Sequence, residues 1–150
     1  MTEARDPEKL RKKLHDFAAK WPYFNLIGFE VLELAPGRSK TRVTFRTNLT
    51  NPDGVMHGGV IATLIDAGIT QAMLMTDEYA AVRDTRGSMS TIDLGVKYVR
   101  AVRDGAITCE SEIVHRGRRV VHARSVVRDE RGKEIALGTA TMLITLGDAK

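Results

Sequence analysis

One carboxylate stands alone in an otherwise uncharged segment. Asp66 is the only charged residue between Gly58 and Thr76. Burying an unpaired carboxylate costs free energy, so either a partner compensates for Asp66 or the protein uses it chemically. Its neighbours at helical spacing are all small, which would leave space for a ligand: Ala62, Thr63, Ala67 and Thr70. Asp66 is therefore a candidate catalytic group; the alternative is a structural aspartate bonded to a backbone amide or to a lysine.

A glycine pair precedes the same segment. His57 is followed by Gly58 and Gly59, and two glycines allow another group to approach the backbone closely. The first amide N–H groups of a helix have no intrahelical acceptor and lie at the positive end of its dipole. Such amides can polarise a carbonyl group and stabilise an oxyanion. The alternatives are an ordinary glycine-rich loop that enters a helix, and a histidine that only caps it.

The spacing of these two features has a geometric consequence. Gly58 and Asp66 are eight residues apart, which is roughly 12 Å along an α-helix. One reacting carbon cannot touch both groups at that separation. If both act on one carbonyl group, they must come from different subunits, so the sequence predicts a site at a subunit interface.

The elements that must position these residues follow from hydrophobic periodicity. Apolar residues recur at helical spacing in two segments, 6–20 and 58–76, and residues 21–23 around a proline are expected to end the first. They alternate with polar residues, as in β-strands, in six segments: 29–34, 40–47, 92–98, 107–115, 120–128 and 135–146. Residues 77–87 are expected to be irregular. Short turns favour antiparallel neighbours, so the prediction is an α+β antiparallel sheet wrapped around the second helix.

Composition restricts the class of protein and its partners. The chain of 150 residues suits one domain, and its net charge of +4 favours an anionic partner. The aromatic residues are scattered, so we expect a phosphorylated small molecule and no nucleic acid. The charged N-terminus lacks the apolar core of a signal peptide, and no uncharged stretch is long enough to span a membrane. We therefore expect a cytoplasmic protein with no membrane partner.

Cysteine and histidine usage predicts neither a disulfide nor a metal site. Cys109 is the single cysteine, and it falls on the apolar face of a predicted strand, where a buried thiol is expected. The histidines do not have the spacing of metal ligands: His15, His57, His115 and His122.

Two segments together resemble a known family. Residues 51–59 (NPDGVMHGG) and 64–67 (LIDA) resemble the motif of hotdog-fold acyl-CoA thioesterases of the phenylacetate-degradation (PaaI) type and, more distantly, of 4-hydroxybenzoyl-CoA thioesterases. The resemblance covers residues 27–144. It implies a hotdog fold, with five to six antiparallel strands around one long central helix. It also implies a single domain over residues 1–150, with a short helical extension at 1–24.

The resemblance implies roles for five residues. Asp66 would be the general base or the nucleophile, and the Gly58 amide of the neighbouring subunit would polarise the thioester carbonyl. Asn51 and His57 would help to place the carbonyl or the attacking water. Thr91 would orient that water, although an ordinary strand threonine is the alternative.

An arginine-rich turn is a candidate contact for coenzyme A. Arginine forks suit phosphate oxygens, and Arg116, Gly117 and Arg118 form a predicted turn. Arg100 and Arg103 lie in another turn that is expected to be nearby. A solvated charged turn is the alternative. No cofactor is expected, since coenzyme A would be part of the substrate.

The resulting hypothesis is metal-free hydrolysis of a small aryl- or acyl-CoA thioester by a homodimer or homotetramer. Two other functions remain as alternatives. A hotdog dehydratase or hydratase would carry a catalytic histidine and a separate acidic residue in a different motif. A non-catalytic acyl-CoA sensor would lose the carboxylate or the glycines. The acyl group, the role of Asp66 as nucleophile or base, and the choice between dimer and tetramer stay open.

Overall fold

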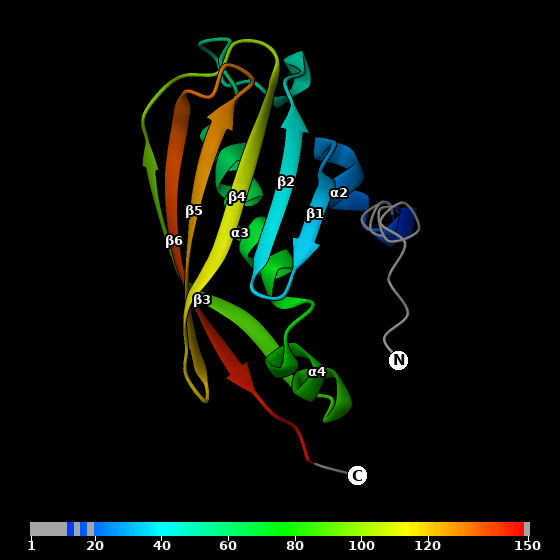
Figure 1. Cartoon of the computed structure of the whole chain (residues 1–150). Coiled ribbons are helices and arrows are strands. Elements are labelled where there is room, and N and C mark those ends of the chain that lie inside the picture. Colours follow the sequence, from blue (N-terminus) through cyan, green and yellow to red (C-terminus); the bar gives the residue numbers. More distant parts are fainter. Residues whose placement is uncertain (1–11, 14–15, 18–19, 149–150) are drawn as a thin grey trace.

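A six-stranded antiparallel sheet curves around one long helix within the described residues (Figure 1). The computed structural model describes residues 12–13, 16–17 and 20–148. The strand order is β1-β2-β4-β5-β6-β3. The strands are β1 (Glu30–Ala35), β2 (Arg38–Thr44), β3 (Ser88–Tyr98), β4 (Ala106–Arg116), β5 (Val120–Asp129) and β6 (Glu134–Thr145). The helices are α2 (Pro22–Ile27), η1 (Thr47–Leu49), α3 (Gly58–Met73) and α4 (Asp77–Asp84). The predicted hotdog architecture is confirmed.

The core lies between α3 and the inner face of the sheet. Leu64, Ile65 and Ile69 on α3 are fully buried, and they belong to one apolar cluster with Val43 of β2 and Ile107 of β4. Alternate residues of β2, β4 and β5 face this helix, as the period of two predicts. Burial of each such side chain contributes about 1.5–3 kcal/mol, so the hydrophobic effect holds the helix in the sheet.

A close approach at Gly68 fixes the position of α3 on the sheet. The Ser39 hydroxyl of β2 donates a hydrogen bond of 2.6 Å to the Gly68 carbonyl oxygen. A Cβ atom on Gly68 would lie 2.8 Å from Ser111 Oγ of β4, so a larger residue would push the helix away. This contact sets the rotation of α3 and therefore which of its faces is turned from the sheet.

The buried position of Cys109 is confirmed. Its side chain is fully buried on the α3 side of β4, and its Sγ lies 3.5 Å from Ser111 Oγ. Burial raises the pKa of the Cys109 thiol, because the thiolate would be desolvated there. This cysteine therefore acts as a small apolar core residue.

The expectation of an irregular segment at 77–87 is wrong, because residues Asp77–Asp84 form α4. The Thr76 hydroxyl caps this helix by accepting a hydrogen bond of 3.3 Å from the Tyr79 amide. Acidic residues occupy its first turn and a basic residue its last, which suits the helix dipole. Only Val82 of this helix is buried, so an apolar stripe could not reveal it.

A proline begins the helix α2. Residues 12–13 and 16–17 are helical, and the rest of the helix expected at 6–20 lies outside the described residues. Pro22 stands at the first position of α2, where its missing N–H costs nothing. The hydroxyl of Tyr23 then hydrogen-bonds that of Thr63 on α3 at 2.8 Å. The first turn of α2 is thereby tied to the central helix.

Within the described ranges, no single helix is both long and apolar enough to cross a membrane. The helices α3 and α4 meet that criterion only when taken together, and they are bent by 85° at the break between them.

Candidate active site

Among the residues that the structure describes, Asp66 has one side-chain partner, and it comes from β3. Thr91 Oγ1 on β3 donates a hydrogen bond of 2.7 Å to Asp66 Oδ1 in the middle of α3. Among the described residues, no lysine or arginine pairs with Asp66, and its Oδ2 has no hydrogen-bond donor. The structure therefore brings these two predicted site residues together and leaves one carboxylate oxygen free to bind water or substrate.

One face of α3 is open in the single chain. The residues that share the Asp66 face are only partly buried: Ala62, Thr63 and Thr70. The remaining faces of the helix are buried against the sheet that wraps around it. The small side chains leave an open strip along the helix beside β3, and Asp66 lies in that strip.

The start of α3 is capped by the histidine of the motif. His57 has an extended backbone, and its Nδ1 accepts a hydrogen bond of 2.9 Å from the Gly59 amide. The neutral ring must then carry its proton on Nε2. The capping role for His57 is confirmed, and a contact with substrate stays a prediction.

The Gly58 amide differs from the two amides that follow it in this first turn. The Gly59 amide donates to the His57 ring, and the Val60 amide donates to the His57 carbonyl oxygen at 2.9 Å. For the Gly58 amide, no acceptor occurs in the described part of the chain. This N–H lies at the positive end of the helix and can donate to an oxyanion.

Asn51 organises the loop that leads into α3. Its Oδ1 accepts hydrogen bonds of 3.0 Å from the Asp53 amide and 3.3 Å from the Val55 amide. The backbone N–H of Asn51 donates a hydrogen bond of 2.8 Å to the Val55 carbonyl oxygen. The loop is joined to its surroundings by the Met56 amide, which donates 2.8 Å to the Val102 carbonyl oxygen. Asn51 therefore positions the helix start, and a direct role in catalysis stays a prediction.

Tyr98 reaches the helix start, and no sequence pattern predicted it there. Its hydroxyl donates a hydrogen bond of 3.0 Å to the Gly58 carbonyl oxygen. Tyr98 and Thr91 both lie on β3, and they contact opposite ends of the stretch from Gly58 to Asp66. The strand therefore runs antiparallel to α3 and supports both halves of the candidate site.

The arginine-rich turn lies at the other end of α3. Arg116 Nη1 is 3.8 Å from Glu78 Oε2 on α4, and Arg118 is exposed in the turn between β4 and β5. In Figure 1 this turn extends toward α4, whereas the loop with Arg100 and Arg103 lies at the opposite end of the sheet. The two arginine groups are therefore not close together in one chain, and a contact with coenzyme A stays a prediction.

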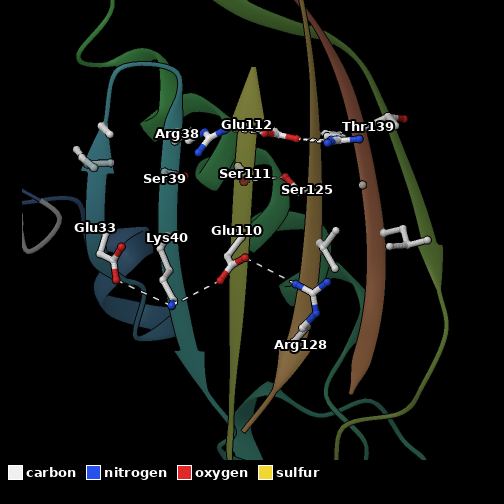
Figure 2. Close-up of a pocket in the computed structure, with 16 residues that line it drawn as sticks. Glu33, Arg38, Ser39, Lys40, Glu110, Ser111, Glu112, Ser125, Arg128 and Thr139 are labelled. Atoms are coloured by element: carbon white, nitrogen blue, oxygen red, sulfur yellow. Dashed lines mark hydrogen bonds and ion pairs between the residues drawn. The ribbon is translucent and has the colours of Figure 1, made fainter. Parts of the chain in front are cut away.

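A hollow of about 850 Å³ occupies the sheet face that is turned away from α3 (Figure 2). Cross-strand ion pairs line it: Lys40 lies 3.9 Å from Glu33 and 3.5 Å from Glu110, and Arg128 lies 3.7 Å from Glu110. Exposed pairs of this kind contribute only about 0–1 kcal/mol each. The hollow contains none of the predicted site residues, so the candidate active site is the open strip on α3.

Comparison with known proteins matches the part of the chain that carries this strip. A family described as the thioesterase superfamily matches residues 53–136, a range that includes the helix start, Asp66 and Thr91. The medium/long-chain acyl-CoA thioesterase YigI of Escherichia coli K12 is 33% identical over 97 residues, which cover 60% of this chain and 63% of that protein. A putative esterase of Saccharolobus solfataricus is 30% identical over 98 residues, which cover 65% of this chain and 61% of that protein. The matched region thus spans under two thirds of these relatives.

Solved structures share the fold over most of the chain. Thioesterase superfamily member 2 of zebra fish has a TM-score of 0.76 and 25% identity, covering 95% of this chain and 100% of that one. A mutant of the phenylacetic acid degradation protein PaaI from Thermus thermophilus has a TM-score of 0.69 and 27% identity. That likeness covers 82% of this chain and 98% of the Thermus chain.

Proposed function

Since the chain belongs to the thioesterase superfamily, we propose that it hydrolyses an acyl-CoA thioester on the open strip of α3. The observation that carries this proposal is the pairing of Asp66 with Thr91 at 2.7 Å. It leaves a carboxylate that has no cationic partner in the described ranges, on a face lined by small side chains.

Asp66 supplies the attacking group in this proposal. As a general base, it removes a proton from water while the water oxygen bonds to the carbonyl carbon. As a nucleophile, it bonds to that carbon itself and forms an anhydride that water then hydrolyses. In both routes the carbon–sulfur bond breaks and coenzyme A leaves as the thiolate. If water attacks the Asp66 carboxyl carbon of the anhydride, a single turnover in ¹⁸O-water puts an unlabelled oxygen of Asp66 into the product, whereas the general-base route puts ¹⁸O there.

The Gly58 amide holds the carbonyl oxygen as negative charge develops on it. One helix separates Gly58 from Asp66 by roughly 12 Å, so we assign the amide to a second subunit. The edge of β3 supports this arrangement, since within the described residues β6 is its only strand partner. Large apolar side chains are exposed there: Ile92 at 57%, Leu94 at 37% and Tyr98 at 55%. Such an edge favours association with another copy.

A two-fold pairing of β3 edges would complete the site. Antiparallel pairing places the Thr91 end of one strand beside the Tyr98 end of the other. Asp66 would then face the partner subunit's Gly58. The turn with Arg116, Gly117 and Arg118 lies at the C-terminal end of α3, which this pairing brings toward the partner's helix start. Its guanidinium groups could therefore bind phosphates of coenzyme A.

An assay of thiol release tests this function. A panel of aromatic and aliphatic acyl-CoA esters is given to the wild type, Asp66→Asn and Asp66→Ala. The matched control is Asp84→Asn on α4, which removes an exposed carboxylate outside the site. We expect turnover in the wild type and the control, and its loss in both Asp66 variants. Tight binding of the esters without turnover in the wild type would contradict hydrolysis and indicate a sensor.

A further inference from the structure

We propose that Tyr98 is a positioning residue that fixes the orientation of the Gly58 amide. The inference rests on the proposed function, in which that amide holds the thioester oxygen. Tyr98 itself does not touch the reacting atoms in this proposal. It acts through the peptide group that joins Gly58 to Gly59.

This peptide group is held from both sides. Its carbonyl oxygen, on Gly58, accepts a hydrogen bond of 3.0 Å from the Tyr98 hydroxyl. Its N–H, on Gly59, donates a hydrogen bond of 2.9 Å to His57 Nδ1. One side chain comes from β3 and the other from the residue that caps α3. Together they fix the plane of the second peptide of the helix, and hence the backbone on which the Gly58 N–H is carried.

The glycine pair fits these two side chains closely. A Cβ atom on Gly58 would lie 3.2 Å from Tyr98 Cζ and 3.3 Å from Tyr98 Oη. A Cβ atom on Gly59 would lie 3.0 Å from His57 Nδ1. The groups that approach the backbone of the glycine pair are therefore these two side chains of the protein itself, and the space beside each Cα is already occupied.

A helix that begins with two glycines needs such support. Glycine costs about 1 kcal/mol relative to alanine within a helix, because it has more conformational freedom to lose. The first turn would fray without contacts that hold it, and an amide N–H whose orientation is not fixed stabilises an oxyanion poorly. Preorganised donors act mainly on the transition state, so loss of the Tyr98 hydroxyl should lower kcat and leave substrate binding nearly unchanged.

The test compares Tyr98→Phe with the wild type, and Tyr79→Phe on α4 is the matched control. The phenylalanine keeps the ring against Gly58 and removes only the hydroxyl. We expect kcat to fall about tenfold, less than for loss of a complete oxyanion donor, with KM within about twofold. We also expect faster hydrogen exchange of the Gly59 amide by NMR, with unchanged subunit assembly. Tyr79→Phe should match the wild type in each measurement.

Two results would overturn the inference. The first is a wild-type kcat in Tyr98→Phe, and the second is a change in KM or assembly with no change in exchange at Gly59. If the wild type hydrolyses no ester at all, the proposed function fails instead. The hydrogen-exchange rate of the Gly59 amide then decides alone. A faster rate in Tyr98→Phe supports the positioning role of Tyr98, and an unchanged rate refutes it.

Discussion

Thr91 Oγ1 lies 2.7 Å from Asp66 Oδ1, which joins the edge strand β3 to the middle of the central helix α3. The bond spans 25 residues of sequence and engages only one of the two carboxylate oxygens. A hydroxyl donor stabilises the ionised carboxylate and fixes the rotation of its side chain. The same bond also sets the direction of the other oxygen, and we propose that Thr91 orients Asp66 in this way.

Removal of the Thr91 hydroxyl should slow the reaction without unfolding the protein. Thr91→Val keeps the shape of the side chain and deletes the donor, whereas Thr91→Ser retains it. A hydrogen bond to a charged group is worth about 1.5–3 kcal/mol, so we expect kcat to fall about ten- to hundredfold in Thr91→Val. Thr91→Ser should stay close to wild type in steady-state kinetics. Equal activity of the valine and serine variants would show that Thr91 is an ordinary strand residue.

A charge on the free edge of β3 should separate the subunits and abolish activity together. Leu94 is 37% exposed and pairs in register with the buried Ala140, so it lies on the α3 side of this edge. We expect Leu94→Lys to sediment as a smaller species with little turnover, because burying the lysine ammonium between two subunits would cost free energy. Leu137→Lys is the matched control, because Leu137 is also 37% exposed but lies in the outer hollow. An active monomeric Leu94→Lys would exclude a shared site.

The buried thiol of Cys109 should make the protein less stable at alkaline pH. Burial raises the pKa of this thiol in the folded protein, so the unfolded chain loses its proton at a lower pH than the folded chain. The contribution to stability is complete below the thiol pKa of the unfolded chain and is lost as pH rises toward the folded value. We expect the free energy of unfolding in urea to fall less between pH 7 and pH 10 in Cys109→Ala than in the wild type. Rapid reaction of the native thiol with a disulfide reagent would show that it is not buried.

The sequence predicted those parts of the fold and site that follow from local pattern. The apolar stripe from Ile61 to Met73 identified α3, because a core helix must repeat at 3.6 residues, and alternation identified all six strands. Asp66, as the single charge of its segment, and the glycines before it could also be recognised from the sequence, because each is defined by its immediate neighbours alone. Thr91 was singled out only through the family resemblance, and its hydrogen bond to Asp66 is a finding of the structure.

The features that the sequence missed depend on packing between distant segments. Tyr98 and Gly58 are 40 residues apart, and their contact exists only because β3 runs antiparallel to α3. The exposed edge of β3 has the pattern of an ordinary alternating strand, since its free side is a property of the whole sheet. The helix α4 was missed because capping at Thr76 and end charges specify it instead of an apolar stripe.

A thioesterase site shared by Asp66 of one subunit and Gly58 of another can be tested by mixing two inactive variants. Asp66→Asn removes the carboxylate, and Gly58→Ala disturbs the amide through the contact with the Tyr98 ring. Each variant alone should be nearly inactive. After the two are unfolded together and refolded as a mixture, half of the dimers should be hybrids, each with one intact site.

We predict that thiol release by this mixture recovers to about a quarter of the wild-type rate, because one site in four then carries both native residues. Each variant refolded alone serves as the control and should recover nothing. A mixture as inactive as its two components would contradict the shared site, since Asp66 and Gly58 would then have to act within one chain.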